Sequence, residues 1–291
     1  MEIKQFYLKN HLSLNINILE GDTIENIKGI LLNIHGIGSH FQPVYHSIDE
    51  FSYKDSFFKK FNFKSFALEF HGHGKSEGKK CFINNFDDLV EDLDIVIKYI
   101  ESIYNQPIYL LCESMGCAVA FKYCIIKKNK IKGVIFLAPL FGISSKLKPN
   151  IILKNILLPI SYIFPWLPLI SSSKNLKSLA TLNENYNDLK EKNDYFYKGK
   201  HRLATCREML FISEWIELNA SFFITPILIF HGKNDFITSV DDTNKMYNKI
   251  NSIDKTLHLI ENGYHILLID SIDNSFIPEF VLIKTLMWLN K

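Results

Sequence analysis

Five short apolar runs, each long enough for one buried strand, constrain the fold of this chain most strongly. The runs are GILLNI (29–34), SFALEF (65–70), PIYLL (107–111), GVIFL (133–137) and PILIF (226–230). Runs that are apolar at nearly every position are typical of strands buried on both faces. Helical periodicity appears between them, most clearly at 84–103, where Asn84 or Asn85 is the expected N-cap. Strands that alternate with helices predict the α/β class, with a mostly parallel central sheet flanked by helices.

The two ends of the chain extend this pattern. Two β-rich runs at 3–8 and 13–20, joined by Lys9-Asn10, predict an opening hairpin. In the C-terminal part we expect a helix at 241–250, a strand at 256–260 and a closing helix at 276–290.

The alternation stops between residues 142 and 223. This stretch contains a proline-rich apolar window, a polar Asn/Lys/Tyr tract and one expected helix near 203–218. An insertion of about 80 residues between two strands of such a sheet is a natural place for a lid. We therefore expect an α/β core made of residues 1–141 and 224–291, with residues 142–223 inserted as a cap (lid) subdomain.

Composition excludes several classes of protein. Hydrophobic residues make up 47% and charged residues 22% of the 291 residues, which excludes a disordered chain. The net charge of +2 gives no reason to expect a nucleic-acid partner. Only Arg202 and Arg207 among the 33 basic residues are arginines, which disfavours recognition by arginine forks. Five cysteines without a C-x-x-C pair indicate a reducing compartment, and no metal or cofactor is expected.

The start of the chain lacks the apolar stretch of a signal peptide, so a cytoplasmic location is expected. The most apolar window, Ile156–Ile170, contains three prolines and is shorter than the roughly 20 residues that span a bilayer. The residues leave open whether this window packs on the core or makes a peripheral membrane contact through the cap. They also leave the oligomeric state open.

The segment CESMG (112–116) follows the PIYLL run directly and precedes an expected helix. A serine between a strand and a helix is typical of a nucleophile elbow, whose tight turn requires small residues two positions before and after it. Gly116 meets this requirement, and Cys112 is small enough for it. Such a serine can also be a simple helix N-cap, but its place on a central strand favours a nucleophile. We therefore predict Ser114 as the nucleophile, with the Met115 N–H directed at an oxyanion.

A second glycine-rich loop, HGIGSH, begins at His35 and follows the GILLNI run. Gly36 and Gly38 on either side of Ile37 let the backbone turn sharply and approach a substrate closely. The Ile37 N–H is therefore predicted as the second oxyanion donor. His35 and His40 are expected to be structural hydrogen-bonding residues and not proton-transfer groups.

The catalytic acid and base are expected in the C-terminal part of the chain. Asp235 follows the PILIF run, and His265 lies in the loop after the next expected strand. His258 lies inside that strand, and the acids at 241–242 are placed to cap a helix, so both are weaker candidates. The order Ser114, Asp235, His265 is the triad order of α/β-hydrolases. In the expected roles, Ser114 attacks, His265 acts as base and then as acid, and Asp235 orients His265.

Six segments together resemble the monoacylglycerol lipase and lysophospholipase branch of the α/β-hydrolase superfamily. They are IHGIGSH, FHGHGKSEG, ESMG, GVIFLAPL, PILIFHGKND and GYHILL, in the family's order. The sequence departs from the family where Cys112 and Cys117 replace glycines around the elbow and where Glu69 replaces the commoner Asp. The HGHGKS part of the second segment lacks the Walker lysine spacing and is interpreted as a tight structural turn.

The resemblance implies the α/β-hydrolase fold, a cap at 142–223, an apolar tunnel and hydrolysis of single-chain acyl esters. It also implies Ile37 and Met115 as the oxyanion donors. We therefore expect a serine hydrolase that cleaves monoacylglycerol or lysophospholipid esters through an acyl-enzyme, with a small-molecule acyl ester as its partner. A general carboxylesterase of broader small-ester specificity on the same fold is the alternative, and the head group and acyl length stay open.

Overall fold

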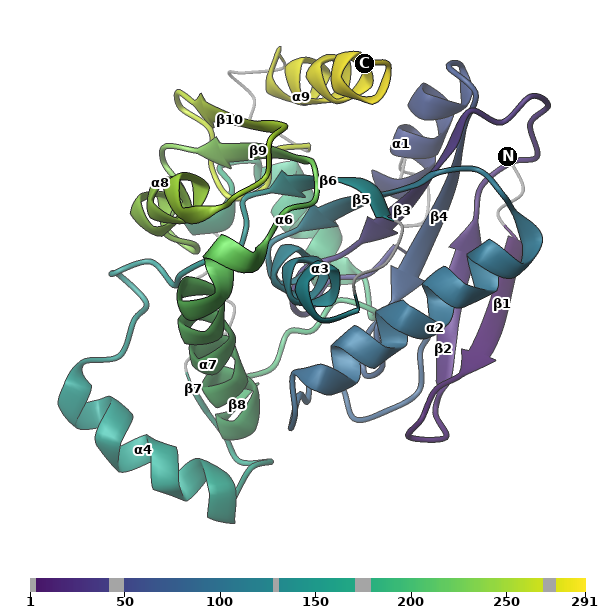
Figure 1. Ribbon diagram of the computed structural model, residues 1–291. Coiled ribbons are helices and arrows are strands. Elements are labelled where there is room, and N and C mark those ends of the chain that lie inside the picture. Colours follow the sequence, from purple (N-terminus) through teal and green to yellow (C-terminus); the bar gives the residue numbers. More distant parts are fainter. Residues whose placement is uncertain (1–3, 42–49, 128–130, 171–178, 269–275) are drawn as a thin grey trace.

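The computed structural model describes residues 4–41, 50–127, 131–170, 179–268 and 276–291. An eight-stranded sheet forms its centre, and helices cover both faces of this sheet (Figure 1). Six of the strands run parallel to one another, and the two nearest the N-terminus are antiparallel to their neighbours. The prediction of an α/β fold with a mostly parallel sheet is confirmed.

Each of the five apolar runs forms a strand of this sheet. The five runs form β3 (Gly29–Ile34), β4 (Phe63–Glu69), β5 (Ile108–Glu113), β6 (Ile131–Leu137) and β9 (Ile227–Gly232). The other three strands of the sheet are β1 (Lys4–Lys9), β2 (Asn15–Glu20) and β10 (Lys255–Ile260). Their order across the sheet is β1-β2-β4-β3-β5-β6-β9-β10. Every residue of β3, β4 and β9 is buried, because other elements cover both faces. The carboxyl ends of the parallel strands meet at one edge, where the loops that follow them can form a site.

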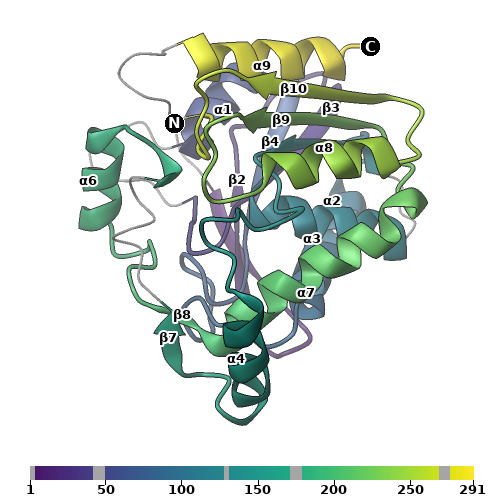
Figure 2. The same ribbon diagram turned by 90° about the vertical axis from the view of Figure 1, so that its left-hand side faces the viewer.

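Helices on the two faces enclose two apolar cores (Figures 1 and 2). One face carries α1 (Glu50–Lys59) and α9 (Phe276–Leu289), and the other carries α2 (Asp87–Ile103), α3 (Met115–Ile126) and α8 (Val240–Lys249). Successive side chains of a strand point to opposite faces. In β5, accordingly, Leu110 belongs to the core under α2 and α3, and Leu111 belongs to the core that contains Trp288 of α9.

Residues 142–223, called the cap segment below, add helices outside this sandwich. They contain α4 (Ile151–Ile163), α6 (Glu184–Lys192), α7 (Leu203–Asn219), the 3₁₀-helix η1 (Ala220–Phe222) and a two-stranded sheet of β7 (Pro168–Ile170) and β8 (His201–Arg202). α7 packs against α3 of the core, and α4 packs against α7 farther from the sheet (Figure 1). The domain boundaries at 142 and 223 stay a prediction.

Among the residues that the structure describes, no helix combines the length and the apolar character needed to cross a membrane.

Two local predictions differ from the structure in detail. The opening hairpin is confirmed, but its turn is longer than Lys9-Asn10, since the Asn10 N–H donates to Leu14 O at 2.9 Å. α2 begins at Asp87 and not at 84. Asn85 is nevertheless at the helix start as predicted, because its Oδ1 accepts from the Asp87 N–H at 3.1 Å and Phe86 already has helical dihedral angles. The Phe86 N–H, which has no partner within the helix, donates to Glu208 of α7 at 2.9 Å.

Three of the described helices, α4, α6 and α1, have no counterpart in the sequence analysis. α4 runs into the proline-rich apolar window, and Pro159 lies inside this helix. α6 is polar and has no buried residue, so it shows no apolar periodicity. α1 has only weak helical periodicity in a stretch rich in Phe, Lys and Ser. Both α6 and α1 depend on tertiary contacts with the rest of the fold more than on a periodic pattern in their own sequence.

Arg207 ties the cap segment to the core. It is buried, and its guanidinium donates to Asn84 O at 2.8 Å, to Ser161 O at 3.0 Å and to Glu208 Oε1 at 2.9 Å. Asn84 precedes α2, whereas Ser161 belongs to α4. A guanidinium presents five donors in a planar fork, so one side chain can hold both carbonyls.

Arg202, the other arginine of the sequence, makes a second connection of this kind. It donates to the Lys80 carbonyl in the loop before α2 and to the Tyr197 hydroxyl at 3.2 Å. Both arginines therefore join the cap segment to the same core loop.

Arg207→Met should lower the free energy of unfolding by about 2–4 kcal/mol, because it leaves the buried Ser161 carbonyl and the partly buried Glu208 carboxylate without their guanidinium donor. Urea unfolding followed by circular dichroism measures this change. Lys245→Met, which removes an exposed ion pair with Glu217, is the control and should leave the midpoint unchanged. Equal midpoints for wild type and Arg207→Met would contradict the anchoring role.

Candidate active site

Ser114 lies in a tight turn between β5 and α3. Its φ of 51° and ψ of −114° lie outside the regions that non-glycine residues favour, and its side chain makes no capping hydrogen bond to α3. The turn is fixed because the Ser114 N–H donates to Leu137 O at 3.0 Å and the Ser114 carbonyl accepts from the Leu140 N–H at 3.1 Å. Strained backbone of this kind gathers at active sites. The turn places Ser114 at the wall of a cavity.

Small residues pack around this turn. A Cβ at Gly116 would lie 2.7 Å from the carbonyl oxygens of Ile34 and His35, so only glycine fits there. Cys112 and Cys117 are fully buried, and the Cys117 thiol donates to the Cys112 carbonyl at 3.1 Å. Burial raises the pKa of both thiols well above the ordinary value, so they stay protonated. These cysteines fill the elbow as small apolar groups.

The HGIGSH loop after β3 lies against the elbow. A Cβ at Gly36 would come within 3.0 Å of Ser114 Cβ, so this glycine permits the close approach. His35 is buried, with its Nδ1 2.7 Å from Gly36 O and its Nε2 3.2 Å from the Phe70 N–H. Ile37, which follows Gly36 in this loop, lines the same cavity as Ser114. The structure thus brings the two predicted oxyanion loops together.

Asp235 is buried, and its carboxylate accepts five hydrogen bonds. Oδ2 accepts from His265 Nδ1 at 2.7 Å, His231 Nε2 at 3.0 Å and Thr238 Oγ1 at 2.7 Å. Oδ1 accepts from the backbone N–H groups of Ile237 at 2.7 Å and Thr238 at 3.0 Å. Burial alone would raise the pKa of Asp235, but the charges and hydrogen bonds of the two histidines lower it well below the ordinary value. Asp235 is therefore an ionised acceptor that orients His265.

Two residues around Asp235 are not identified by the sequence reasoning. His231 is fully buried at the end of β9, with its Nδ1 2.9 Å from Thr243 Oγ1. Thr238 Oγ1 lies 3.4 Å from His265 Nδ1, and Thr238 also lines the cavity. The HGKND segment could have indicated His231, because this histidine lies at the end of a strand and precedes Asp235 by four positions.

The structure joins Asp235 to His265 directly, whereas no described hydrogen bond joins His265 to Ser114. Thr238 contacts His265 and shares the cavity wall with Ser114. In enzymes without substrate, catalytic hydrogen bonds are often long and tighten when substrate binds. The weaker candidates lie elsewhere, since the His258 ring stacks on Phe230 and the acids at 241–242 begin α8.

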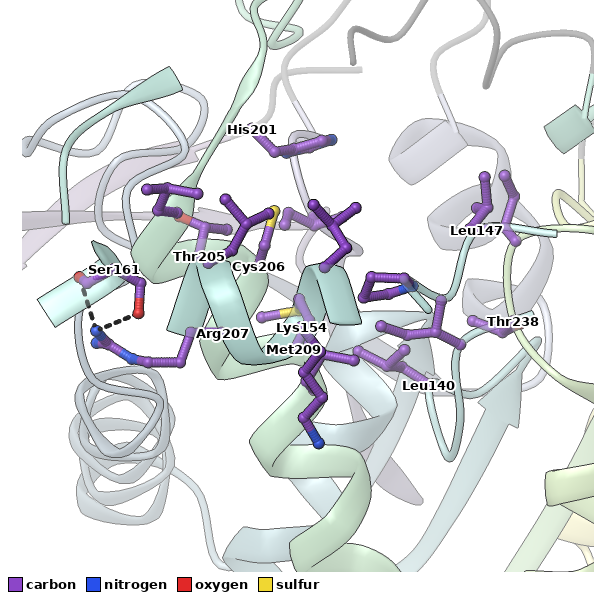
Figure 3. A pocket seen from close by; sticks show the side chains of 18 of the residues that line it. Leu140, Leu147, Lys154, Ser161, His201, Thr205, Cys206, Arg207, Met209 and Thr238 are labelled. Atoms are coloured by element: carbon purple, nitrogen blue, oxygen red, sulfur yellow. Dashed lines mark hydrogen bonds between the residues drawn. The ribbon is translucent and has the colours of Figure 1, made fainter. Parts of the chain in front are cut away.

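A cavity of about 810 Å³ lies between the elbow and the cap segment (Figure 3). Figure 3 shows Leu140 and Thr238 on one side of it and Ser161 and Arg207 on the other. Most of the other lining residues are aliphatic or Met, among them Leu153, Leu157 and Leu158 of α4 and Leu203, Met209 and Leu210 of α7. Such a cavity can enclose an apolar molecule and expose it to Ser114.

The HGHGKS loop (71–76) is the structural turn that the sequence predicts. Gly72 and Gly74 have φ values of 70° and 50°, and the Ser76 hydroxyl donates to Glu69 O at 2.5 Å. The Glu69 carboxylate in turn accepts from the Phe41 N–H at 2.9 Å, beside the oxyanion loop. Within the described residues, no group of three or more His, Cys, Asp or Glu side chains could hold a metal ion.

Comparisons with known proteins identify the family and the fold of this chain. A family model described as "Serine aminopeptidase, S33" matches residues 25–272. Caffeoylshikimate esterase of Arabidopsis thaliana is 27% identical over 271 residues, which cover 91% of this chain and 78% of that protein. Monoglyceride lipase of Rattus norvegicus is 24% identical over 242 residues, which cover 82% of this chain and 76% of that protein.

Solved structures share the fold. The structure of a soluble variant of monoglyceride lipase from Saccharomyces cerevisiae, in complex with a substrate analog, superposes with a TM-score of 0.81. The superposition covers 100% of this chain and 95% of that chain at 18% identity, a level at which the likeness concerns the fold alone.

Stability should depend on Asp235 in a defined pH range. Its pKa is lower in the folded chain than in the unfolded one, so its ionised form stabilises the fold above the ordinary pKa of about 3.9. This contribution begins to fall as the pH drops below that value, and it is lost completely only below the lowered pKa of the folded chain. We expect the difference in unfolding free energy between wild type and Asp235→Asn to shrink from about pH 5 to about pH 3. Urea unfolding across this range measures it, and a constant difference would contradict the lowered pKa.

Proposed function

The chain belongs to the serine aminopeptidase S33 family and has the α/β-hydrolase fold, and we propose that it cleaves carboxylic esters of single-chain lipids. It is a hydrolase whose relatives include an esterase and a monoglyceride lipase. The proposed substrate is a monoacylglycerol or a lysophospholipid, and the proposed triad is Ser114, His265 and Asp235. The apolar cavity beside Ser114 is the observation that carries this proposal.

In the proposed acylation step, Ser114 Oγ attacks the ester carbonyl carbon while His265 Nε2 takes its proton. Because the ionised Asp235 accepts from His265 Nδ1 at 2.7 Å, Nε2 is the nitrogen left to accept that proton. The same carboxylate stabilises the imidazolium that forms. The carbon–oxygen bond to the leaving group then breaks, and His265 returns the proton to the departing alcohol. The acyl group stays on Ser114.

Deacylation uses the same groups in reverse. His265 takes a proton from water, the water oxygen attacks the acyl carbon, and Ser114 Oγ leaves with that proton as the fatty acid is released. We assign the oxyanion of both steps to the N–H groups of Ile37 and Met115. Met115 is the first residue of α3, so the positive end of the helix dipole supports the same charge. Loss of one such donor typically costs about 10²–10³ in kcat.

The size and the mostly apolar lining of the cavity suit an acyl chain. Its volume of about 810 Å³ lies in the upper part of the roughly 300–1,000 Å³ found for ligand pockets. Its charged lining residues are all cationic, Lys146, Lys154 and Arg207. Each methylene that leaves water contributes up to about 0.8 kcal/mol, or up to about fourfold in kcat/KM. An aliphatic wall therefore favours long chains over short ones.

A general carboxylesterase is the second candidate. The esterase among the relatives favours it. The kcat/KM of such an enzyme would rise little with acyl length, because its binding energy would come from contacts with the leaving group.

We further propose that α4 rests on a lipid surface. Its inner side lines the cavity, whereas Ile152, Ile156 and Ile163 on its outer side are 69%, 54% and 64% exposed. A helix that is apolar all round is expected to be buried or in contact with lipid. The exposed side continues into Phe164 and Trp166, and aromatic rings favour the membrane interface.

A series of p-nitrophenyl esters from acetyl to palmitoyl tests the substrate class. We expect kcat/KM to rise with acyl length by up to about fourfold per methylene until the cavity is filled. Monoacylglycerols and lysophospholipids then compare head groups at one acyl length. A flat profile, or one that favours short chains, would support the carboxylesterase instead.

The control in this series is Ser114→Ala, which should lower kcat by about 10⁴–10⁶-fold without changing the urea midpoint. A fluorophosphonate probe should label wild type and not this variant. Ser213→Ala is the matched serine control, since Ser213 Oγ donates to Met209 O on α7 and does not line the cavity. Undiminished hydrolysis by well-folded Ser114→Ala would contradict the proposed mechanism.

Ile152→Asp should weaken cosedimentation with phosphatidylcholine vesicles by about tenfold, because it places a charge on the proposed lipid-facing side. Hydrolysis of acetyl ester in solution should not change. Ile253→Asp is the matched control, since Ile253 is fully exposed in the turn before β10. Equal vesicle binding by the two variants would exclude α4 as the contact.

A further inference from the structure

A short piece of the cap segment contacts the loop that carries Ile37. The Tyr197 N–H donates to the Gly38 carbonyl at 3.0 Å. Gly38 has a φ of +69°, and a Cβ there would lie 3.3 Å from Tyr197 Cβ, so the two segments meet at backbone distance. The neighbouring Phe196 ring packs on the His40 ring, with 4.3 Å between their centroids. We call residues 193–202 the strap.

The strap is itself fastened to the core. The Tyr197 hydroxyl donates to Lys200 O at 2.6 Å and accepts from Arg202 Nη1 at 3.2 Å. Arg202 also donates to the Lys80 carbonyl, which belongs to the core loop before α2. The strap therefore has a defined position relative to the sheet, and the oxyanion loop lies against it.

On the core side, His35 fixes the peptide that joins Gly36 to Ile37. The Phe70 N–H donates to His35 Nε2 at 3.2 Å, so Nδ1 carries the hydrogen and donates it to Gly36 O at 2.7 Å. The Gly36 carbonyl and the Ile37 N–H belong to one planar peptide, so this bond sets the direction of the N–H. The strap holds the carbonyl two residues farther along, that of Gly38. The Ile37 N–H is thus fixed by one contact from the core and one from the cap segment.

We propose that the strap positions the oxyanion loop through the Tyr197 N–H, so that the cap segment supports transition-state stabilisation as well as substrate enclosure. This proposal rests on the function proposed above, in which Ile37 is an oxyanion donor. Tyr197 is a positioning residue, because it is not among the residues that line the cavity. Oxyanion donors act at about 2.7–3.1 Å from the developing charge. Loss of the strap contact should therefore lower kcat and leave KM nearly unchanged.

Tyr197→Pro removes the N–H donor, and Tyr197→Phe is the matched control that keeps it. We expect Tyr197→Pro to lower kcat by about 10–100-fold with KM within about threefold of wild type. Its affinity for butylboronic acid, which forms a tetrahedral adduct on Ser114, should fall by a similar factor. Tyr197→Phe keeps the N–H but loses the two hydroxyl contacts within the strap, so its kcat should fall clearly less than that of Tyr197→Pro. A wild-type kcat in folded Tyr197→Pro, or a rise in KM alone, would overturn the proposal.

A measurement on the wild-type chain decides the case in which Tyr197→Pro does not fold. If the strap fixes the oxyanion loop, a ligand in the oxyanion hole must stabilise the strap in return, because coupling between sites is reciprocal. Butylboronic acid should therefore slow amide hydrogen exchange in residues 193–202, and unchanged exchange would overturn the proposal. Failure of the proposed function is distinguishable, since wild type would then neither hydrolyse esters nor react with a fluorophosphonate.

Discussion

The strained backbone at Ser114 is the constraint on which the rest of the site depends. β5 passes directly into α3 at this residue, which requires its positive φ, and Gly116 must lie against the carbonyls of Ile34 and His35. The register of the sheet makes this possible, because Ile34 of β3 pairs with Cys112 of β5. The loop after β3 and the elbow after β5 therefore begin at the same level. The HGIGSH loop therefore reaches Ser114, the proposed nucleophile, because the two strands are neighbours in register.

The same logic places the acid and the base. Gly232 of β9 pairs with Ile260 of β10, so the loops with Asp235 and His265 also begin side by side. Burying an ionised carboxylate is costly unless its oxygens are hydrogen-bonded. Five donors around Asp235 offset that cost, and two of them are backbone N–H groups of its own loop. The acid is therefore fixed before any substrate arrives.

The sequence predicts the parts whose signal is local. Strands buried on both faces need apolar residues at nearly every position, so β3, β4, β5, β6 and β9 are visible as runs. Ser114 and Asp235 can be picked out because each follows such a run, and His265 because it lies in the loop after the next expected strand. His231 and Thr238 are harder to find, since their importance comes from tertiary contacts with Asp235. The strap has no sequence signature at all, because a bond between two backbone groups distant in sequence leaves no mark on side-chain pattern.

The two arginines show the same limit of sequence analysis, and their hydrogen bonds hold the cap segment on the core. Their scarcity argues against a charge clamp on the substrate, but composition does not say where they lie. Both bind carbonyl oxygens at the junction of cap segment and core. Hydrogen bonds to neutral carbonyls are directional and depend little on salt, unlike the ion pair between Lys154 of α4 and Glu214 of α7. The strap and the bond from Arg207 to Asn84 therefore tie the cap segment to the core, whereas Arg207 and Glu214 of α7 hold α4 within the cap segment.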